Sequence, residues 1–247
     1  MKIIVTIEAR MSSTRLPGKV LLPILGKPAL EHMIQRVKAA RYVDEIVIAT
    51  TTNSADDEIV SLCQRLGVGY YRGSEDNVLE RVYLAAKTFK ADLICKLTGD
   101  CPLIDPLIID HMILEHLNGK YDYSSNRLNE RSYAIGFDTE VFDFNTLEKT
   151  YQSTKDIMDL THVTCYIYHH PQKFKLHAVN APISLQSGDL RITLDTIEDF
   201  TLIEKIFKAL QKDESTFSAY EIVHFLRNNP SLILLNKDVR QKKVEEG

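Results

Sequence analysis

The sequence predicts an α/β protein with a mostly parallel sheet. Apolar runs rich in Ile and Val, typical of strands buried on both faces, recur at residues 2–8, 45–50 and 92–98. Patterns with apolar residues at helical spacing lie between these runs, so strand alternates with helix. The composition is 44% hydrophobic and 26% charged over 247 residues, which is typical of a globular chain long enough to bury a substantial core.

Three helices are expected in the first part of the chain. The first begins at Pro28, a plausible first helical position, and continues to residue 37. The second covers 55–66 and ends at Gly67, a residue typical of helix C-termini. The third covers 77–89. Together with the three strands, these helices predict repeated βαβ units over the first hundred residues.

The second part of the chain is less regular. Pro106 begins a helix that continues to about residue 117, with Asp105 as its cap. We expect an extended segment at 132–142, a helix at 156–168 and strands at 174–179 and 190–194. Two further helices are expected, at 196–210 and after the capping box formed by Ser218 and Glu221. No linker composition interrupts the chain, so we expect one domain over 1–247 with an added substrate lobe.

Composition excludes several classes of protein. The 34 acidic and 30 basic residues give a net charge of −4, which argues against a general nucleic-acid or membrane-surface binder. The four cysteines contain no C-x-x-C pair and no zinc-ligand spacing, which argues against a disulfide framework or a zinc site and favours reduced thiols. No apolar run reaches the roughly 18 residues of a membrane span, and the N-terminal run is too short for a signal peptide. We therefore expect the protein to be located in the cytoplasm.

Several catalytic motifs are absent. Gly18 and Lys19 are followed by Val20, which lacks the hydroxyl of a P-loop. Gly67, Gly69 and the next glycine do not have dinucleotide-binding spacing. Neither G-x-S-x-G nor H-E-x-x-H occurs. The sequence therefore lacks the motifs typical of hydride transfer, serine hydrolysis and zinc proteolysis.

The segment after the first strand, 9–19, is the most informative. It combines Arg10, Arg15 and Lys19 with three consecutive hydroxyl residues at 12–14. Arginine forks, a lysine charge and hydroxyl groups are suited to a polyphosphate. The alternative is a solvated charged turn, but the carboxyl end of a parallel strand is where open α/β sheets bind ligands. We therefore predict a phosphate-binding loop.

Two later carboxylates also follow predicted strands. Asp100 stands at the end of the third strand, where it offers a hard oxygen ligand for Mg²⁺. Asp195 follows the predicted strand at 190–194 and completes a two-carboxylate site if the chain brings them together. Its alternative role is as a helix cap, although Thr196 and Asp199 already supply capping chemistry. The spacing does not decide whether Asp100 and Asp195 meet.

Taken together, the segments 9–19, 99–103 and 195–199 resemble the cytidylyltransferases that activate acidic sugars, including the CMP-Kdo and CMP-sialic acid synthetases. The branch known as spore-coat polysaccharide biosynthesis protein F is also similar at 72–81 and 161–164. The resemblance covers about the first two hundred residues in the right order. It implies a nucleotide-diphosphosugar transferase-like three-layer α/β/α sandwich with a mixed, mostly parallel sheet, with the nucleotide bound by 1–120 and the acceptor and dimer contacts by 121–235.

The resemblance also implies roles for individual residues. Asp100 and Asp195 hold Mg²⁺, and Cys101, which replaces a Glu of the Kdo enzymes, argues against Kdo itself as the acceptor. The residues expected to bind the CTP phosphates or to lie near the base, ribose or acceptor are Ala9, Arg10, Ser12, Ser13, Thr14, Arg15, Lys19, Arg72, Ser74, Asn77, Arg81 and Thr98. Those expected to act in catalysis are Arg10, Arg15, Lys19 and Asp100.

The acceptor residues come from the less regular half. We expect Tyr133, Asp138, Glu140 and His162 to line the acceptor pocket. For Asp138 and Glu140 the alternative is an exposed strand face, because they alternate with apolar residues.

The predicted function is Mg²⁺-dependent transfer of CMP from CTP to an acidic sugar, a sugar-like phosphate or a phosphonate, with release of pyrophosphate, by a homodimer. One alternative is a nucleotidyltransferase that uses UTP or another nucleotide. A glycosyltransferase of the same fold is a second alternative, but Asp100 is not part of an Asp-x-Asp pair. The third is a non-catalytic nucleotide-binding protein, which would have no need of Lys19, Asp100 and Asp195 together.

Overall fold

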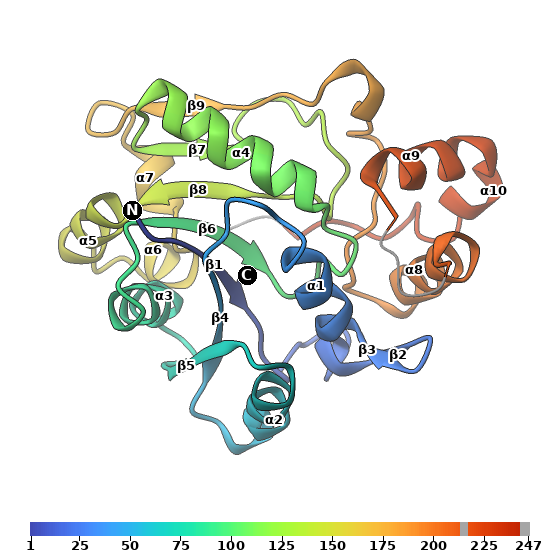
Figure 1. The fold of residues 1–247 in the computed structure, drawn as a ribbon, viewed down its shortest axis with the longest axis horizontal. Coiled ribbons are helices and arrows are strands. Elements are labelled where there is room, and N and C mark those ends of the chain that lie inside the picture. The colour runs from blue at the N-terminus through green and yellow to red at the C-terminus, as the bar shows by residue number, and fades with distance from the viewer. Residues whose placement is uncertain (213–216, 243–247) are drawn as a thin grey trace.

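The central element is a seven-stranded mixed sheet with the strand order β5-β4-β1-β6-β8-β7-β9 (Figure 1). The computed structural model describes residues 1–212 and 217–242. Strands β5, β4, β1 and β6 are parallel, β8 is antiparallel to both β6 and β7, and β9 is parallel to β7. The strands are β1 (Ile3–Glu8), β4 (Glu45–Thr51), β5 (Gly69–Gly73), β6 (Leu93–Thr98), β7 (Tyr123–Ser125), β8 (Glu140–Asp143) and β9 (Leu176–Ala178). The α/β class and the mostly parallel sheet are confirmed.

Helices cover both faces of this sheet and produce three layers. Alternate residues of β1 enter two cores: Val5 and Ile7 enter one, and Ile4 enters the other. The first core is covered by α1 (Ala29–Val37), α2 (Asp57–Leu66), α4 (Pro106–Gly119), α8 (Ile197–Leu210) and α9 (Ala219–Asn228). The second is covered by α3 (Val78–Thr88), α5 (Phe144–Ser153), α6 (Ile157–Thr161) and α7 (Cys165–His169). Figure 1 shows α1 and α4 on one side of the strands and α3 with α5 at the other.

The loops after β1 and β6 meet at one edge of the sheet. The Gly99 amide donates a hydrogen bond to the Glu8 carbonyl (2.8 Å), and a Cβ on Gly99 would lie 2.9 Å from that oxygen, so only glycine allows this approach. The Leu194 amide donates to the Asp100 carbonyl (2.7 Å), which brings a third loop to the same edge. Gly18 has φ +69° and closes the first loop through a hydrogen bond from its amide to the Met11 carbonyl (2.9 Å).

Most of the expected elements are present. The helices expected in the first part are α1, α2 and α3, and α2 ends at Gly67 in the left-handed conformation. Asp105 caps α4 with its carboxylate, and both α8 and α9 begin with capping boxes. The strand expected at 174–179 is the shorter β9.

Three expectations for the second part are corrected. Only the end of the extended segment at 132–142 is a strand, β8, because the residues before it form a loop. The helix expected at 156–168 is interrupted at 162–164 and forms α6 and α7 instead. The segment 190–194 is not a strand: Arg191 makes a single bridge to Ile135, and its side chain bonds to Asp195 and Asp199. The apolar pattern of this segment gave no indication of these ion pairs.

Several elements were not expected from the sequence. Strand β5 is half-buried along its whole length, so its apolar pattern is weak. Helix α5 buries Thr146 and Thr150 beside a single leucine, so its buried face contains few apolar residues. The remaining unexpected elements are β7, the small hairpin of β2 (Pro23–Ile24) and β3 (Lys27–Pro28), and α10 (Pro230–Ile233). Within the described residues, no helix is both long and apolar enough to cross a lipid bilayer.

Candidate active site

A cavity of about 320 Å³ opens where β1 and β6 end. Its walls come from the loop after β1, the first turns of α3, the end of α6 and the turn before α8. The lining residues are Glu8, Ala9, Arg10, Ser13, Thr14, Arg15, Lys19, Val20, Val78, Arg81, Thr98, Gly99, Asp100, Thr161, His162, Asp195 and Lys242. Eleven of these were expected from the sequence: Ala9, Arg10, Ser13, Thr14, Arg15, Lys19, Arg81, Thr98, Asp100, His162 and Asp195.

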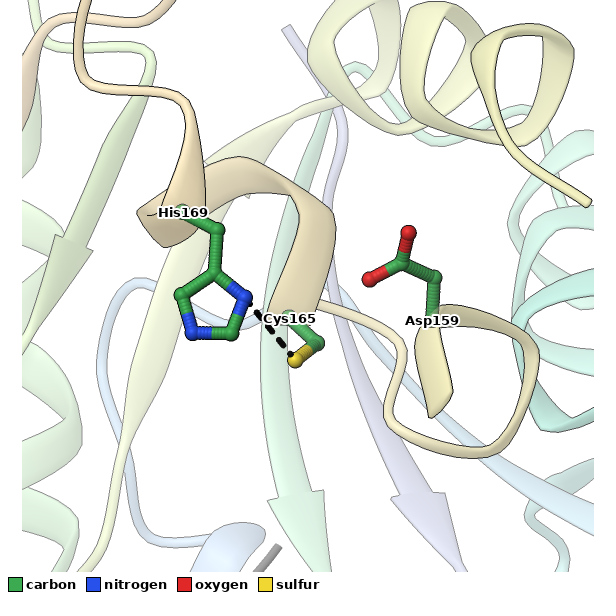
Figure 2. A group of neighbouring side chains, drawn as sticks. All are labelled: Asp159, Cys165 and His169. Atoms are coloured by element: carbon green, nitrogen blue, oxygen red, sulfur yellow. Dashed lines mark hydrogen bonds between the residues drawn. The ribbon is translucent and has the colours of Figure 1, made fainter. Parts of the chain in front are cut away.

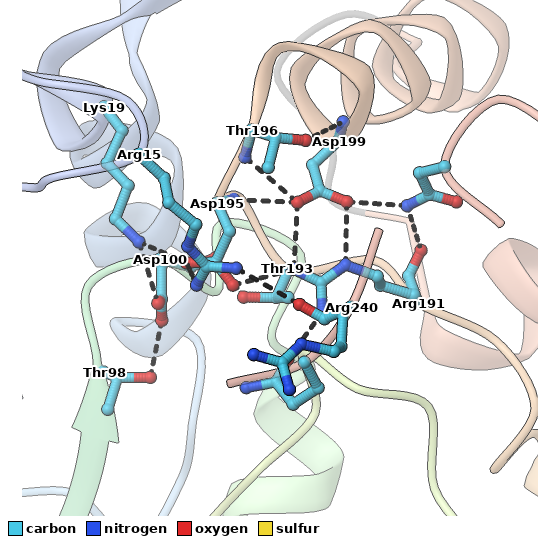
Figure 3. Close-up of polar contacts among 12 residues, drawn as sticks. Arg15, Lys19, Thr98, Asp100, Arg191, Thr193, Asp195, Thr196, Asp199 and Arg240 are labelled. Atoms are coloured by element: carbon cyan, nitrogen blue, oxygen red, sulfur yellow. Dashed lines mark hydrogen bonds and ion pairs between the residues drawn. The ribbon is translucent and has the colours of Figure 1, made fainter. Parts of the chain in front are cut away.

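Lys19 joins the two carboxylates whose meeting the sequence left undecided. Its Nζ lies 3.0 Å from Asp100 Oδ2 and 2.7 Å from Asp195 Oδ1 (Figure 3). The Arg15 guanidinium also reaches Asp195, with Nη2 2.9 Å from Oδ1. Residues 81 and 176 positions away from Lys19 therefore form one cluster of charges at the carboxyl ends of the strands.

The electrostatics of this cluster keep Lys19 and Asp100 ionised. Burial by itself would lower the pKa of Lys19, but the Asp100 and Asp195 carboxylates outweigh burial and raise it. For Asp100, burial acts upward, but the Lys19 ammonium and the Thr98 hydroxyl, which donates to Oδ1 at 2.6 Å, lower the pKa to about 2. Both groups are charged at neutral pH.

The two carboxylates have the chemistry of a divalent-cation site. They come from different loops, converge on one cation and offer hard oxygen atoms of the kind that Mg²⁺ prefers. The cation that they share is the flexible Lys19 side chain, and Asp195 is also paired with Arg15 and Arg191. The donor set therefore fits the metal that the sequence resemblance implies.

Asp195 and the capping residues of α8 have separate tasks. Arg191 Nη2 donates to Asp195 Oδ2 (2.7 Å), while Arg191 Nε donates to Asp199 Oδ1 (2.9 Å). Asp199 is fully buried and accepts the backbone amides of Asp195 (3.0 Å) and Thr196 (3.1 Å). Asp199 thus caps the helix and orients Arg191, which leaves Asp195 facing the cavity.

The chain beyond α10 returns to this network, which the sequence did not indicate. Asn236 Nδ2 donates to Asp199 Oδ1 (2.7 Å), and Arg191 Nη1 donates to Gln241 Oε1 (2.5 Å). Arg15 Nη1 donates to the Arg240 carbonyl (3.5 Å), as Figure 3 shows beside the ion pairs. The C-terminal segment therefore helps to position two arginines of the site.

Glu8 and Arg81 bring unsatisfied polar atoms to the cavity. Among the described residues, Glu8 Oε1 and Arg81 Nε are buried without a hydrogen-bond partner, and Lys96 Nζ lies 3.5 Å from Glu8 Oε1. Burial raises the pKa of Glu8 despite Lys96 and Arg81. Sequence reasoning missed Glu8, although a charged residue that ends a buried apolar strand is an available indication. Glu8 therefore brings a buried carboxylate, ion-paired with Lys96, to the cavity wall, and Arg81 brings an Nε without a hydrogen-bond partner, which a bound ligand could satisfy.

Glu140 does not line the cavity but lies buried behind Glu8. Lys96 Nζ is 3.3 Å from Glu140 Oε1, and the hydroxyl groups of Tyr123 (2.6 Å) and Thr164 (2.5 Å) donate to Oε2. Burial opposes ionisation, but Lys96 and Arg127 outweigh it and lower the pKa of Glu140 to about 2. The alternative of an exposed strand face is wrong for this residue, which is 3% exposed.

The other predicted acceptor residues are dispersed. Asp138 is paired with Arg131. Tyr133 is buried and lines a separate cavity of about 610 Å³ between α4 and α9. Of the four acceptor candidates, only His162 therefore lines the cavity that holds Lys19 and Asp100.

Four of the residues predicted to bind the nucleotide do not line the cavity and instead form hydrogen bonds in the neighbouring loops and at the start of α3. Arg72 donates to the Thr51 and Asn53 carbonyls (both 2.8 Å) and pairs with Asp57. The other three are Ser12, which donates to Glu75, Ser74, which accepts the Asn77 amide, and Asn77, which caps α3.

Comparison with known proteins places the chain among the cytidylyltransferases. A family model described as cytidylyltransferase matches residues 4–238. The spore coat polysaccharide biosynthesis protein SpsF of Bacillus subtilis is 34% identical over 242 residues, covering 92% of this chain and 95% of the relative. The 3-deoxy-manno-octulosonate cytidylyltransferase of Geobacter sulfurreducens is 38% identical over 115 residues, covering 46% of this chain and 44% of the relative.

A solved structure extends the similarity to the whole fold. A cytidylyltransferase from Leptospira borgpetersenii superimposes with a TM-score of 0.89 and 32% identity, covering 98% of this chain and 99% of its own. The sequence match and the superposition indicate the same family, and the cluster of Lys19, Asp100 and Asp195 is compatible with it. The chain is a nucleotidyltransferase that belongs to the cytidylyltransferase family.

Proposed function

We propose that this enzyme transfers the cytidylyl group of CTP to a small acidic acceptor and releases pyrophosphate. The observation that carries the proposal is the cluster of Lys19 and Arg15 with Asp100 and Asp195 in the cavity at the ends of β1 and β6. The similarity to a 3-deoxy-manno-octulosonate cytidylyltransferase supports CTP as the nucleotide and a sugar acid as the acceptor class.

In this proposal the triphosphate lies against the loop after β1. Arg10, Arg15 and Lys19 supply positive charge, and the hydroxyl groups of Ser13 and Thr14 supply further donors on the same wall. Because its neighbouring carboxylates keep Lys19 protonated, it presents an ammonium group to the phosphoryl oxygens and stabilises the charge that develops as pyrophosphate leaves. Four residues that do not line the cavity position this wall through hydrogen bonds to its neighbours: Ser12, Arg72, Ser74 and Asn77.

Asp100 and Asp195 are the residues that would hold Mg²⁺. When bound, the ion neutralises negative charge on the triphosphate and on the departing pyrophosphate. Thr98 and Arg191 fix the two carboxylates, since each donates to one oxygen of its partner.

We assign the acceptor to the end of the cavity that contains Glu8, Arg81, Thr161 and His162. Glu8 Oε1 accepts a hydrogen bond from an acceptor hydroxyl, and Arg81 Nε donates to an anionic group beside it, so both buried atoms gain partners. The hydroxyl oxygen forms the new bond to the α-phosphorus, the bond from that phosphorus to the bridging oxygen breaks, and Glu8 takes the proton. The nucleotide wall comes from residues 1–120, and Thr161 and His162 come from the half 121–235.

Two further features of the proposal concern the setting of the enzyme. The four cysteines are free and buried, which supports a reducing compartment such as the cytoplasm. A homodimer through the second half stays a prediction. The apolar side chains of Ile183 and Tyr220, which are 90% and 54% exposed, support it.

The test is pyrophosphate release by the purified enzyme with Mg²⁺. CTP, UTP, ATP and GTP are each supplied with acidic sugars, sugar phosphates and phosphonates, and Asp100→Asn serves as the control for contaminating activity. We expect release that depends on both CTP and an acidic acceptor. Release with UTP in place of CTP contradicts the choice of nucleotide, and turnover without an added acceptor contradicts transfer.

A further inference from the structure

Three metal-ligating side chains meet outside the cavity. Cys165 and His169 lie one helical turn apart on α7, and Asp159 lies on α6 (Figure 2). One ligand atom from each of the three lies within 4.8 Å of the others. The thiol is buried, the carboxylate is half-buried and the imidazole is exposed, so an ion from solvent can reach the cluster.

Although the cysteine spacing in the sequence argued against a zinc site, the Cys165 sulfur and the His169 nitrogen lie at a separation that suits tetrahedral zinc. Cys165 Sγ and His169 Nδ1 are 3.5 Å apart. Zinc bonds of about 2.3 Å to sulfur and 2.0–2.1 Å to nitrogen at a tetrahedral angle place the two ligand atoms about 3.6 Å apart. The pair is thus already at the separation that zinc requires, and a carboxylate oxygen of Asp159 lies within 4.8 Å of both atoms.

Two neighbouring hydroxyl groups hold these ligands from outside. Thr154 Oγ1 donates to Asp159 Oδ2 (2.7 Å), which leaves the other carboxylate oxygen available. Tyr168 Oη donates to Cys165 Sγ (3.4 Å) and can continue to do so when the sulfur is a thiolate. Such outer hydrogen bonds orient ligands in known metal sites.

We propose that Asp159, Cys165 and His169 bind one Zn²⁺ ion, at a site separate from Asp100 and Asp195, with water as the fourth ligand. Sulfur and imidazole ligands select zinc over Mg²⁺, which prefers oxygen alone. Binding forms the zinc–sulfur bond and releases the thiol proton to solvent, because burial raises the pKa of Cys165 and the metal-free thiol is protonated.

The ion would tie together the two short helices on either side of His162. The His162 amide donates to the Met158 carbonyl of α6 (2.8 Å), and the His162 carbonyl accepts from the Cys165 amide of α7 (2.7 Å). Zinc therefore braces the turn that carries His162 into the wall of the cavity.

The test uses the full-length chain freed of metal with a chelator. Zn²⁺ is titrated in competition with a chromophoric chelator, and Co²⁺ is used separately as a spectroscopic probe. We expect one equivalent of zinc and a thiolate-to-cobalt charge-transfer band. His169→Ala and Asp159→Asn should each weaken zinc affinity at least tenfold, and Cys165→Ser should also abolish the cobalt band.

Matched variants distinguish this site from zinc binding elsewhere on the chain. Cys63→Ala removes a different buried cysteine, and His170→Ala removes a histidine whose Nδ1 contacts the Tyr166 carbonyl; both should bind zinc as the unaltered protein does. Asp100→Asn should also retain zinc, because Asp100 is not a ligand in the proposal. His169 is exposed, so its alanine variant is expected to fold, which circular dichroism verifies. Absence of stoichiometric zinc, or unchanged binding in His169→Ala, overturns the proposal.

Discussion

At the scale of single residues, Lys19 joins the two carboxylates of the candidate active site. Its ammonium group contacts carboxylates from two loops that are far apart in the sequence. In the proposed function, Asp100 and Asp195 would hold Mg²⁺, and the Lys19 ammonium would then be available to the phosphates. The Lys19 ammonium thus bridges the two carboxylates, and Arg15 and Arg191 supply further positive charge to Asp195.

Asp100→Asn tests the metal assignment. We expect turnover to fall about 10²–10³-fold, because one charged ligand is lost while the side-chain shape is retained. Asp189→Asn is the matched control, since Asp189 forms an exposed pair with Arg227 outside the cavity. Steady-state kinetics and circular dichroism compare the two variants. Near-normal turnover of folded Asp100→Asn refutes the assignment.

Glu8→Gln tests the acceptor end of the cavity. The amide retains the size of the carboxylate but is a poor base and a weaker hydrogen-bond acceptor. We expect a kcat lowered by about 10²-fold and a raised KM for the acceptor, with the KM for CTP nearly unchanged. Kinetics with each substrate varied in turn provide the measurement. A rise only in the KM for CTP places Glu8 at the nucleotide instead.

At the scale of elements, the buried pair between β6 and β8 links the sheet to the active site. Lys96 and Glu140 are opposite each other in the antiparallel register, and Glu8 on β1 lies on the other side of Lys96. Three adjacent strands therefore share one network of charges. Glu140 therefore stabilises the ion pairs between β6 and β8 and does not line the cavity itself.

Glu140→Gln should lower the free energy of unfolding by about 3 kcal/mol, because it removes one partner of a buried ion pair. Glu204→Gln is the control: Glu204 pairs with Lys208 on the surface of α8, where such a pair contributes at most about 1 kcal/mol. Chemical denaturation of both variants at neutral pH gives the comparison. Equal, small losses contradict the assigned role of Glu140.

The same pair predicts a pH dependence. The pKa of Glu140 falls from its ordinary 4.5 to about 2 in the folded protein, as Lys96 and Arg127 outweigh burial. Its contribution to stability is therefore complete above pH 4.5 and is lost as the pH falls toward 2. The difference in stability between the unaltered protein and Glu140→Gln should shrink over this interval. Denaturation curves at several pH values measure it, and a constant difference is the contrary result.

At the scale of the whole molecule, the sheet order explains how one cavity receives residues from both halves. Strand β1 lies in the middle of the sheet, with the parallel strands β4 and β5 on one side and β6, β8, β7 and β9 on the other. Residues 9–19 leave from this central strand, so they contact both the loop after β6 and the turn before α8.

CTP with Mg²⁺ should stabilise the whole protein. A ligand at about 100 times its Kd adds about 2.7 kcal/mol, which for a chain of this size raises Tm by about 5–10 °C. We expect this shift with CTP and Mg²⁺, and a smaller one with EDTA or with UTP. Thermal denaturation monitored by fluorescence is sufficient. An equal shift with EDTA contradicts a metal-assisted nucleotide site.

The sequence by itself determined the strands and helices whose formation depends on neighbouring residues. Continuous apolar runs predicted the buried parallel strands, because a strand covered on both faces excludes polar residues. Cap residues such as Asp105 and Thr196 predicted where helices begin, since capping depends on neighbours within four residues. The composition of the loop 9–19 and its place after the first strand predicted a cavity-lining segment, and phosphate binding by it stays a prediction. These features depend on short-range interactions.

Only the tertiary structure decided the features that depend on contacts between distant segments. The meeting of Asp100 with Asp195 through Lys19 depends on three loops that converge at one edge of the sheet. The burial of Glu140 depends on a long-range ion pair with Lys96, which replaces water as the partner of each charge. The burial of Glu8 beside Lys96 and Arg81 likewise becomes apparent only when the strands are assembled. Sequence spacing carries no information on such contacts, because it is the folded chain that sets the distances between these charges.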